Sequence, residues 1–288
     1  MSTLWLNCND NPITYNKKNY LLRAAKRLNF DNVKDIKIKD YEYMKKEYVL
    51  NIEPYTYISG KKWTGIWEID LLLARDEREL KRWEEANDIF IAIEFIPLGF
   101  EKFLDKIRIL SEACDPELHK HLDIKRKYDF ILCGTWDQAV WSERRRLIEL
   151  LAKTYSFHNF GKDFAPDDYV KILNTARVQF VRSMGTKHGQ GEIAQRFYDA
   201  LAIGPCLVNY QSDLDRLNLI EGFDYYSYKS DNELLEKMEI LIKAPNIADR
   251  MAKAGRQKAL VYHTYDNRLL TLIKFLKHKY AFNNDNEQ

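Results

Sequence analysis

The sequence predicts an α/β protein made of two units with mainly parallel sheets. Short apolar segments alternate with amphipathic ones along the chain, which is the pattern that strands and helices give in such a protein. The alternation pauses at a polar connection near residue 124 and then starts again. The chain has 288 residues, 45% of them hydrophobic and 31% charged, so it is long enough to form two packed cores.

The first half of the chain contains most of the expected strands. Leu21, Leu22, Ala25 and Leu28 share one face of a helix over residues 19–28. The other expected elements are strands at residues 4–7, 33–38, 48–52, 89–93 and 107–110, an apolar segment at 65–73, and helices at 77–86 and 100–106. We expect these strands to form the sheet of a first domain, residues 1–123.

The second half repeats this pattern and defines a second domain, residues 124–266. Leu147, Leu150 and Leu151 mark one face of a helix. The expected elements are strands at 128–133 and 178–181, a small apolar strand after Pro205, helices at 143–153, 167–175, 231–242 and 247–263, and a closing segment at 267–280.

Charge and cysteine content restrict the function only broadly. The net charge is +2, and the ten Lys/Arg against six Asp/Glu in the first fifty residues fit a solvated face as well as a polyanion-binding patch. The most apolar run, residues 89–100, is short and includes Glu94, so we expect no integral membrane contact. No signal peptide is expected, and four scattered cysteines without zinc-type spacing predict a cytoplasmic protein with no metal site: Cys8, Cys114, Cys133 and Cys206.

The most informative stretch is residues 185–209, where a glycine-rich loop leads into a short amphipathic helix. Glu192, Arg196 and Asp199 follow one another at i, i+4 and i+7, within an arc of about 60° on that helix. An apolar stripe is expected beside them: Ile193, Phe197 and Leu201. Because helix N-termini and glycine backbone N–H groups attract anions, this stretch predicts a site for a nucleotide diphosphate.

Several segments in a fixed order carry a family resemblance. They are ACDPELH at 113–119, YDFILCG at 128–134, RFYDALAIGP at 196–205, AGR at 254–256 and HTYDNR at 263–268. Through these segments the chain resembles the group 1 glycosyltransferases, most closely their CgeB-like branch, over roughly residues 107–275.

The resemblance implies the GT-B architecture, in which two Rossmann-like domains with parallel sheets face each other across a cleft. It also implies that the nucleotide-sugar donor binds mainly to the C-terminal domain and the acceptor mainly to the N-terminal domain. The last helix, about 267–280, is expected to pack back on the first domain. No metal cofactor is expected, because basic side chains and a helix N-terminus stabilise the leaving pyrophosphate in such enzymes.

An E-x(7)-E pattern marks the donor helix in the wider superfamily, and this chain carries a degenerate form of it. The second acid, five residues before the helix-ending glycine, binds the ribose hydroxyls in the superfamily, and Asp199 has that position. The first acid would fall on Gly191, but the glutamate comes one residue later, at Glu192. Arg196 matches the arginine of the CgeB-like branch.

The residues expected to bind the donor combine cations, glycines and this helix face. They are Gly134, Arg182, Lys187, His188, Gly189, Gly191, Glu192, Arg196 and Asp199. Arg182, Lys187 and the glycine backbone would hold the diphosphate, and Gly134 ends a strand where ligands gather. The plainer alternatives are a strand-to-helix turn for the loop and a tight turn at Gly134. The triple arginine at 144–146 fits a solvated helix face, of which one member could reach a phosphate.

Three carboxylates in the first domain are candidate catalytic bases. Glu68 and Asp70 lie close to Trp63 and Trp67, a combination that binds a sugar or a base and supplies a proton acceptor. A half-buried strand explains the same residues. Glu94 is the third candidate. An inverting enzyme requires such a base, whereas a retaining one does not, and both outcomes stay open.

The predicted function is transfer of a sugar from a nucleoside diphosphate sugar, most simply a UDP-sugar, to an acceptor hydroxyl. The acceptor is a hydroxymethylated DNA base, as in compact viral enzymes, or a glycan, with protein and small molecules also open. The alternative is a non-catalytic GT-B protein that binds nucleotide sugars or glycans. A dinucleotide enzyme is disfavoured because no G-x-G-x-x-G follows a strand.

Overall fold

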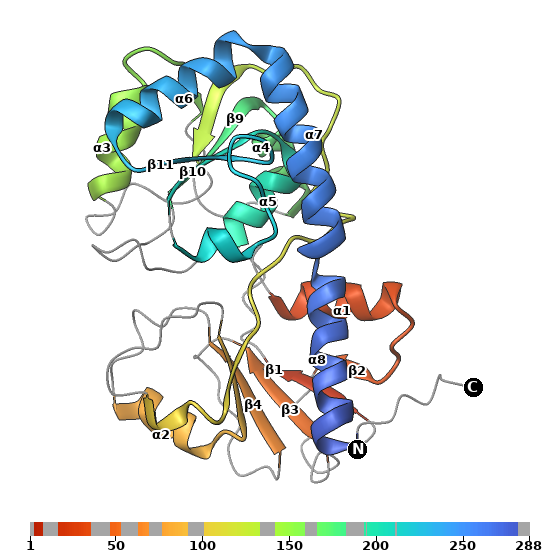
Figure 1. Ribbon diagram of the computed structural model, residues 1–288. Coiled ribbons are helices and arrows are strands. Elements are labelled where there is room, and N and C mark those ends of the chain that lie inside the picture. Colours follow the sequence, from red (N-terminus) through yellow and green to blue (C-terminus); the bar gives the residue numbers. More distant parts are fainter. Residues whose placement is uncertain are drawn as a thin grey trace. The chain divides into compact units, whose positions relative to one another are not determined.

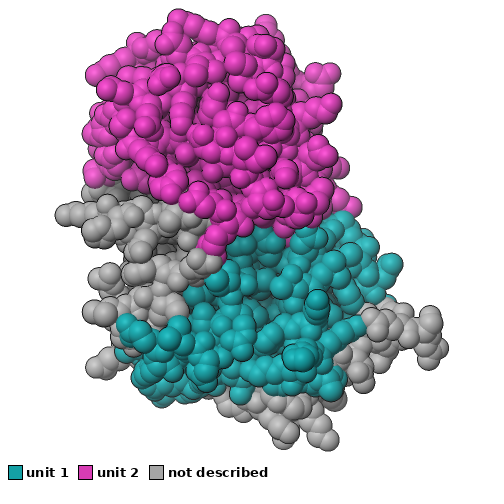
Figure 2. Space-filling view, in the orientation of Figure 1, with its two compact units in different colours: residues 1–111, 265–288 teal, residues 112–264 magenta. Residues whose placement is uncertain are grey.

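A computed structural model describes residues 3–7, 17–35, 47–52, 63–68, 77–91, 101–132, 142–158, 166–182, 193, 195–210 and 212–281. The chain divides into two compact units, coloured separately in Figure 2. Unit 1 consists of residues 1–111 and 265–288, and unit 2 of residues 112–264. Each unit contains one parallel sheet with helices, which confirms the predicted α/β class.

Unit 1 contains a six-stranded sheet in the order β2-β1-β3-β4-β5-β6, in which every neighbouring pair is parallel. Figure 1 labels β1, β2, β3 and β4 of this sheet. Its strands are β1 (Leu4–Asn7), β2 (Val33–Asp35), β3 (Tyr48–Ile52), β4 (Trp63–Glu68), β5 (Asp88–Ile91) and β6 (Ile107–Ile109). Its helices are α1 (Lys17–Arg27), α2 (Glu77–Glu85) and α8 (Tyr265–Tyr280).

Alternating side chains of β5 show which helix covers which face of this sheet. Ile89 and Ile91 join Trp83 of α2 in one apolar cluster. Phe90 points the other way and meets Phe275 of α8 edge-to-face, with the ring centroids 5.5 Å apart. The sheet is therefore covered on both faces, as a parallel sheet requires.

The C-terminal helix α8 is fastened to unit 1 at both ends. At its start, the Nε of Arg27 in α1 donates to the Asp266 carboxylate at 3.0 Å, and Tyr265 stacks on Tyr20. At its end, Lys279 and Tyr280 both bind the carboxylate of Asp88, at the first residue of β5. These contacts complete unit 1 with the last part of the chain.

Unit 2 contains a five-stranded parallel sheet in the order β11-β10-β9-β7-β8. Its strands are β7 (Tyr128–Leu132), β8 (Phe157–His158), β9 (Ala176–Val181), β10 (Cys206–Asn209) and β11 (Tyr226–Tyr228). Its helices are α3 (Ser142–Leu151), α4 (Pro166–Leu173), α5 (Gln195–Ile203), α6 (Asp231–Lys243) and α7 (Pro245–Tyr262).

In unit 2 as well, successive side chains of a strand point to opposite faces of the sheet. Val178 and Phe180 of β9 lie in one buried cluster with residues of α3 and α6. Gln179 points the opposite way and donates its side-chain amide to the carbonyl of Leu173, the last residue of α4. In α7, a Cβ added at Gly255 would lie 2.4 Å from the Asp224 carbonyl oxygen, so only glycine allows this close approach.

The border between the units lies at 111/112 and 264/265, rather than near residue 124 and at 266 as expected. The Cys114 N–H donates to the His263 carbonyl at 2.9 Å, and Cys114 also forms an isolated parallel bridge with Thr264. The connection that the sequence assigned to the first domain is therefore tied to the end of α7 and forms part of unit 2.

Three other elements differ from the sequence expectations. Within the described residues of the segment expected as a helix at 100–106, only a 3₁₀ turn forms, Glu101–Phe103, with i→i+3 hydrogen bonds at Leu104 and Lys106. The short strands β8 and β11 were not expected, because two or three residues are too few for a recognisable pattern.

Candidate functional site

The topology of unit 2 indicates where a ligand would bind. From β7 the chain proceeds to β8 on one side, then returns to place β9 on the other side of β7. In an open parallel sheet, ligands bind outside the carboxyl ends of the strands at such a switch point. Here those ends are Leu132 of β7 and Val181 of β9, and Arg182 follows Val181 directly.

Three arginines from different elements interact at this edge of unit 2. Arg144 of α3 is only 3% exposed, and its Nε donates to the Arg182 carbonyl at 3.0 Å. Burial, followed by the positive charges of Arg196 and Arg182, lowers the pKa of Arg144. A guanidinium stays protonated in proteins, so this shift means that the cluster holds positive charges at an energetic cost. An anion bound there would relieve that cost.

The helix that was expected to carry an acid–base–acid face begins later than predicted. Ile193 lies outside any helix, and α5 begins at Gln195. The predicted start of this helix is therefore wrong, and the first turn of α5 contains no acidic residue. Glu192 lies outside the described residues, which leaves Arg196 and Asp199 as the expected site residues on α5.

Asp199 is fully buried, which the sequence did not indicate. Its carboxyl lies 3.3 Å from the His119 Nδ1 and accepts a long hydrogen bond from the Tyr169 hydroxyl. His119 Nδ1 already accepts the Asp115 N–H at 2.9 Å, so it has no proton to give to Asp199. Burial, and then the charge of Glu112, raise the pKa of Asp199 well above its usual value and favour the neutral acid.

These contacts change the interpretation of Asp199. A ribose hydroxyl could reach this carboxyl only if its packing opened, because the side chain has no exposed surface. The structure instead gives Asp199 partners inside unit 2, between α5, α4 and the connection that contains His119. The expectation that Asp199 is accessible failed because helical spacing places Asp199 on a face of α5 but does not say whether that face meets solvent or protein.

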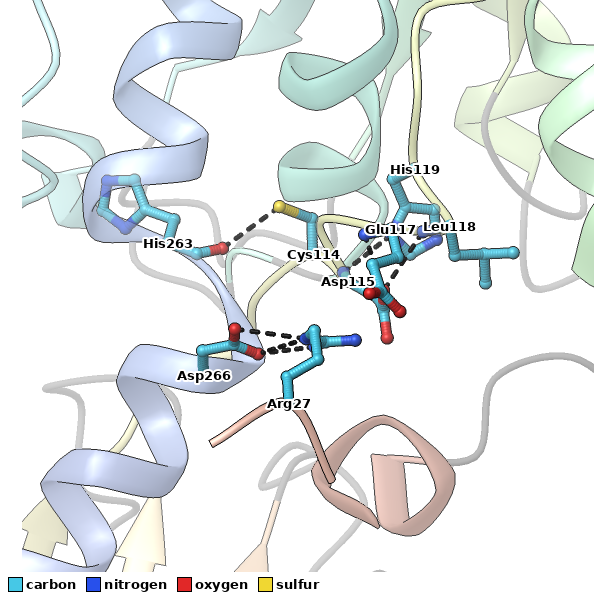
Figure 3. Close-up of polar contacts among 8 residues, drawn as sticks. All are labelled: Arg27, Cys114, Asp115, Glu117, Leu118, His119, His263 and Asp266. Carbon is cyan, nitrogen blue, oxygen red and sulfur yellow. Dashed lines mark hydrogen bonds and ion pairs between the residues drawn. The ribbon is translucent and has the colours of Figure 1, made fainter. Parts of the chain in front are cut away.

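The connection at 112–119 also fixes the C-terminal end of α5. The Asp115 carboxylate accepts the N–H groups of Glu117 and Leu118 and forms a capping turn, as Figure 3 shows. Arg256 of α7 donates to the carbonyls of His119 and Ala202. The segments ACDPELH, RFYDALAIGP and AGR therefore meet through hydrogen bonds, which gives a structural reason for their occurrence together.

Most other predicted site residues lie outside the described residues and stay predictions. These are Asp70, Glu94, Gly134, Lys187, His188, Gly189, Gly191 and Glu192. Glu68 is the last residue of β4, at the carboxyl edge of the unit 1 sheet. Nearby, Trp67 is buried and its Nε1 donates to the Leu110 carbonyl, so this tryptophan has a place in the core of unit 1.

Arg144 is the functional candidate that sequence reasoning did not select. The signal was present in the triple arginine at 144–146, but the pattern did not say which member turns inward. In the structure Arg145 and Arg146 are exposed and Arg144 is buried. Within the described part of the chain, no group of three His, Cys, Asp or Glu side chains is arranged to hold a metal ion.

The fold has the GT-B pattern of two Rossmann-like units, and solved structures share it over nearly the whole chain. Sucrose-phosphate synthase from Thermosynechococcus elongatus is 10% identical with a TM-score of 0.64, covering 98% of this chain and 100% of that chain. HepE from Anabaena, in complex with UDP and glucose, is 8% identical with a TM-score of 0.66, covering 96% and 100%. A DNA-modifying β-glucosyltransferase is 14% identical with a TM-score of 0.58, covering 96% and 98%.

The sequence itself identifies the family. A family model described as glycosyl transferase-like matches residues 115–274, more than half of the chain. The chain therefore belongs to the glycosyl transferase-like family and is a glycosyltransferase. The finer assignment to the CgeB-like branch stays a prediction. A search of curated proteins found no match, and none of the helices in the described ranges has the length and apolar character needed to cross a membrane.

Proposed function

We propose that this glycosyltransferase uses a UDP-sugar as its donor and binds the donor's diphosphate at the arginine cluster of unit 2. The observation that supports this proposal is the convergence of Arg144, Arg182 and Arg196 at the switch point of a parallel sheet. Guanidinium groups bind phosphate oxygens in pairs, and their positive charge stabilises the diphosphate as it leaves.

Uridine is the proposed nucleoside because HepE, a protein of the same fold, was solved in complex with UDP and with UDP-glucose. In the proposed reaction an acceptor oxygen forms a bond to the anomeric carbon, the bond from that carbon to the diphosphate breaks, and the hydroxyl proton is released. The products are the glycosylated acceptor, UDP and a proton. A carboxylate such as Glu68 would accept that proton if the enzyme inverts the configuration.

Calorimetry with UDP, UMP and uridine tests the donor site. Replacing Arg182 or Arg196 by Gln should weaken UDP binding about 10- to 100-fold, the scale of a lost charge-assisted hydrogen bond. The affinity for uridine, which has no phosphate, should stay the same. Arg145→Gln is the matched control, since Arg145 is an exposed neighbour of Arg144. Equal losses in the control variant, or no binding of UDP to the native chain, would overturn the proposal.

Slow hydrolysis of UDP-glucose separates an enzyme from a protein that only binds nucleotide sugars. The displaced first acid of the E-x(7)-E pattern is the feature that favours such a binding protein. Release of UDP without any acceptor, lost in Arg196→Gln, is expected for a transferase. Tight UDP-glucose binding with no release over many hours would favour the binding protein.

A further inference from the structure

The hydroxyl group of Tyr228 is buried, yet it has no hydrogen-bond partner within the described part of the chain. Tyr228 is the last residue of β11 and is 6% exposed. An unpaired buried hydroxyl destabilises a protein, and phenylalanine would fill the same space without that cost. The packing of unit 2 therefore accounts for the ring of Tyr228 but not for its hydroxyl group.

The side chain of Tyr228 leans toward the switch point of the unit 2 sheet. Its ring stacks on that of Phe180 in β9, with the ring centroids 5.9 Å apart and the planes at 27°. Strands β9 and β11, both labelled in Figure 1, are separated by β10, so their backbones are about 10 Å apart. The two rings therefore meet above β10, and Tyr228 extends from the edge strand toward β9, the strand that Arg182 follows.

Arg182 lies at the same level of the carboxyl edge as Tyr228. Val208 of β10 pairs with Val181 of β9 and with Ser227 of β11. Arg182 and Tyr228 each come one position after these paired residues. Among the charges of the described residues, that of Arg182 acts most strongly on the pKa of Tyr228. The hydroxyl of Tyr228 therefore belongs to the same edge as the arginine cluster.

The Tyr228 hydroxyl is suited to donate a hydrogen bond to an anion. Burial raises the pKa of Tyr228, so the hydroxyl keeps its proton at neutral pH. The charges of Arg182 and Arg146 lower this pKa in part, and those of Glu143 and Asp231 raise it. Both carboxylates already bind Arg146, at 2.9 and 2.6 Å. A protonated phenol can donate to a phosphate oxygen, which accepts several hydrogen bonds.

We infer that Tyr228 is a further donor-binding residue, whose hydroxyl donates a hydrogen bond to the diphosphate beside Arg182. This inference rests on the proposed UDP-sugar site, and it adds a neutral group to a cluster of arginines. The tyrosine keeps its proton throughout, so it binds the diphosphate and takes no part in proton transfer. The diphosphate supplies the acceptor that the described residues do not give this hydroxyl.

A ligand reaches this hydroxyl only when the atoms that cover it shift, as it does the buried Arg144. For Asp199, such an opening would break the hydrogen bond from Tyr169 and the contact with His119. The Tyr228 hydroxyl has no hydrogen bond to a described residue that an opening would break. This difference favours Tyr228 over Asp199 as a group that a ligand recruits.

Calorimetry with Tyr228→Phe tests the inference, because this variant removes the hydroxyl and keeps the ring that stacks on Phe180. Its affinity for UDP should fall about tenfold, the scale of a lost hydrogen bond to a charged group. Its affinity for uridine, which has no phosphate, should stay that of the native chain. Without nucleotide, the variant should melt at the native temperature or above it, since the fold loses no hydrogen bond.

Tyr226→Phe is the matched control, since Tyr226 lies two residues earlier on the same face of β11. This variant should bind UDP and uridine like the native chain. The ³¹P resonance signals of bound UDP should change in Tyr228→Phe and stay the same in Tyr226→Phe.

The inference is overturned if Tyr228→Phe binds UDP as tightly as the native chain, leaves the ³¹P signals unchanged or melts at a lower temperature. It is also overturned if uridine affinity falls as much as UDP affinity, or if the control loses UDP affinity equally. Absence of UDP binding to the native chain would instead refute the donor proposal.

Discussion

Asp199 and its neighbours show how burial changes the role of a charged residue. A carboxyl 3.3 Å from a histidine nitrogen resembles an ion pair, but that nitrogen accepts a backbone N–H, and the carboxyl has no exposed surface. We therefore treat Asp199 as a neutral acid that packs α5 against the connection at 112–119. Arg196, three residues earlier on the helix, depends on that packing for its position.

The protonation of Asp199 makes a prediction about stability and pH. Because its folded pKa is raised, the native state keeps a proton that the unfolded state releases above about pH 3.8, so this group's contribution to stability falls as pH rises from there through the raised folded pKa. Asp199→Asn, which mimics the neutral acid, should show a smaller decline in the free energy of unfolding between pH 5 and pH 8. Denaturant titrations of both proteins measure this difference.

A large loss of stability in Asp199→Asn would instead show that Asp199 and His119 form a charged pair. If Asp199 were ionised against a protonated His119, the asparagine would cost about 3–5 kcal/mol near neutral pH, because a buried charge would lose its partner. A loss of that size would contradict the neutral acid. His119→Gln is a useful second variant, since it keeps an acceptor near the Asp115 N–H.

For individual residues, the sequence indicated which side chains belong to the site better than it indicated how deeply each of them is buried. Arg182 and Arg196 were selected, and both lie in the arginine cluster of unit 2. Arg144 was hidden among three consecutive arginines, and the burial of Asp199 depended on contacts with residues 30 and 80 positions away. Side-chain burial is decided by tertiary packing, which helical spacing alone does not contain.

Among the elements, α1 and α8 show how two helices far apart in the sequence become one structural layer. Arg27 lies in the last turn of α1 and Asp266 in the first turn of α8, so each charge also opposes the partial charge of its own helix end. Their side chains are 16% and 22% exposed. This pair lies where solvent screens charges only in part, unlike the exposed pair Lys243–Glu239.

Breaking the pair should lower stability measurably. Asp266→Ala should reduce the free energy of unfolding by about 1–3 kcal/mol, because Arg27 keeps its charge in a half-buried place without this carboxylate. Chemical denaturation followed by tryptophan fluorescence measures the change, since Trp67 and Trp83 are buried in unit 1. Glu239→Ala is the control and should leave the denaturation midpoint unchanged; an equal effect in both variants would contradict this assignment.

Gly255 of α7 gives a second prediction about a helix, in which the change in stability has the opposite sign to the usual one. Replacing a helix-interior glycine by alanine normally stabilises a protein by up to about 1 kcal/mol. Here Gly255→Ala should instead destabilise by about 1–3 kcal/mol, since the new methyl would meet the Asp224 carbonyl at 2.4 Å and force α7 away. The melting temperature of the variant measures the effect, and a higher melting temperature would show that α7 does not depend on this contact.

The sequence predicted long elements well and short ones poorly. Helices such as α3, α6 and α7 start and end within a few residues of their expected bounds, because several turns of apolar periodicity define them. The start of α5 was placed too early, since the apolar and charged spacing of the sequence continues before Gln195, whereas Ile193 lies outside any helix.

For the whole molecule, the division into units determines which segments of the chain each unit needs in order to fold. Unit 2 is a continuous stretch, residues 112–264, whereas unit 1 needs both the first 111 residues and α8. The sequence anticipated the return of the last helix only through the family resemblance. Nothing in the apolar pattern of residues 267–280 says which sheet that helix covers.

Removing the last helix should therefore affect the two units unequally. A chain ending at Thr264 lacks the five buried side chains of α8 and leaves the Phe90 face of the unit 1 sheet without this helix. The five are Tyr265, Leu269, Leu272, Ile273 and Leu276. Limited proteolysis with mass spectrometry should show rapid cleavage within residues 1–111 and a resistant fragment close to 112–264. A chain lacking only residues 282–288 is the control and should resist cleavage throughout. Equal digestion of both units would contradict their independence.

The connection at Cys114, where the chain runs beside its own return at His263 and Thr264, has a consequence for biosynthesis. The ribosome produces the six strands of the first sheet early, but α8, which covers one face of that sheet, is made only after the whole of unit 2. Unit 2 can therefore reach its native state while unit 1 still lacks α8. Nascent chains of this enzyme should therefore expose one apolar face of that sheet to chaperones until α8 has emerged from the ribosome, and a message shortened before α8 should yield a product that aggregates through its N-terminal part.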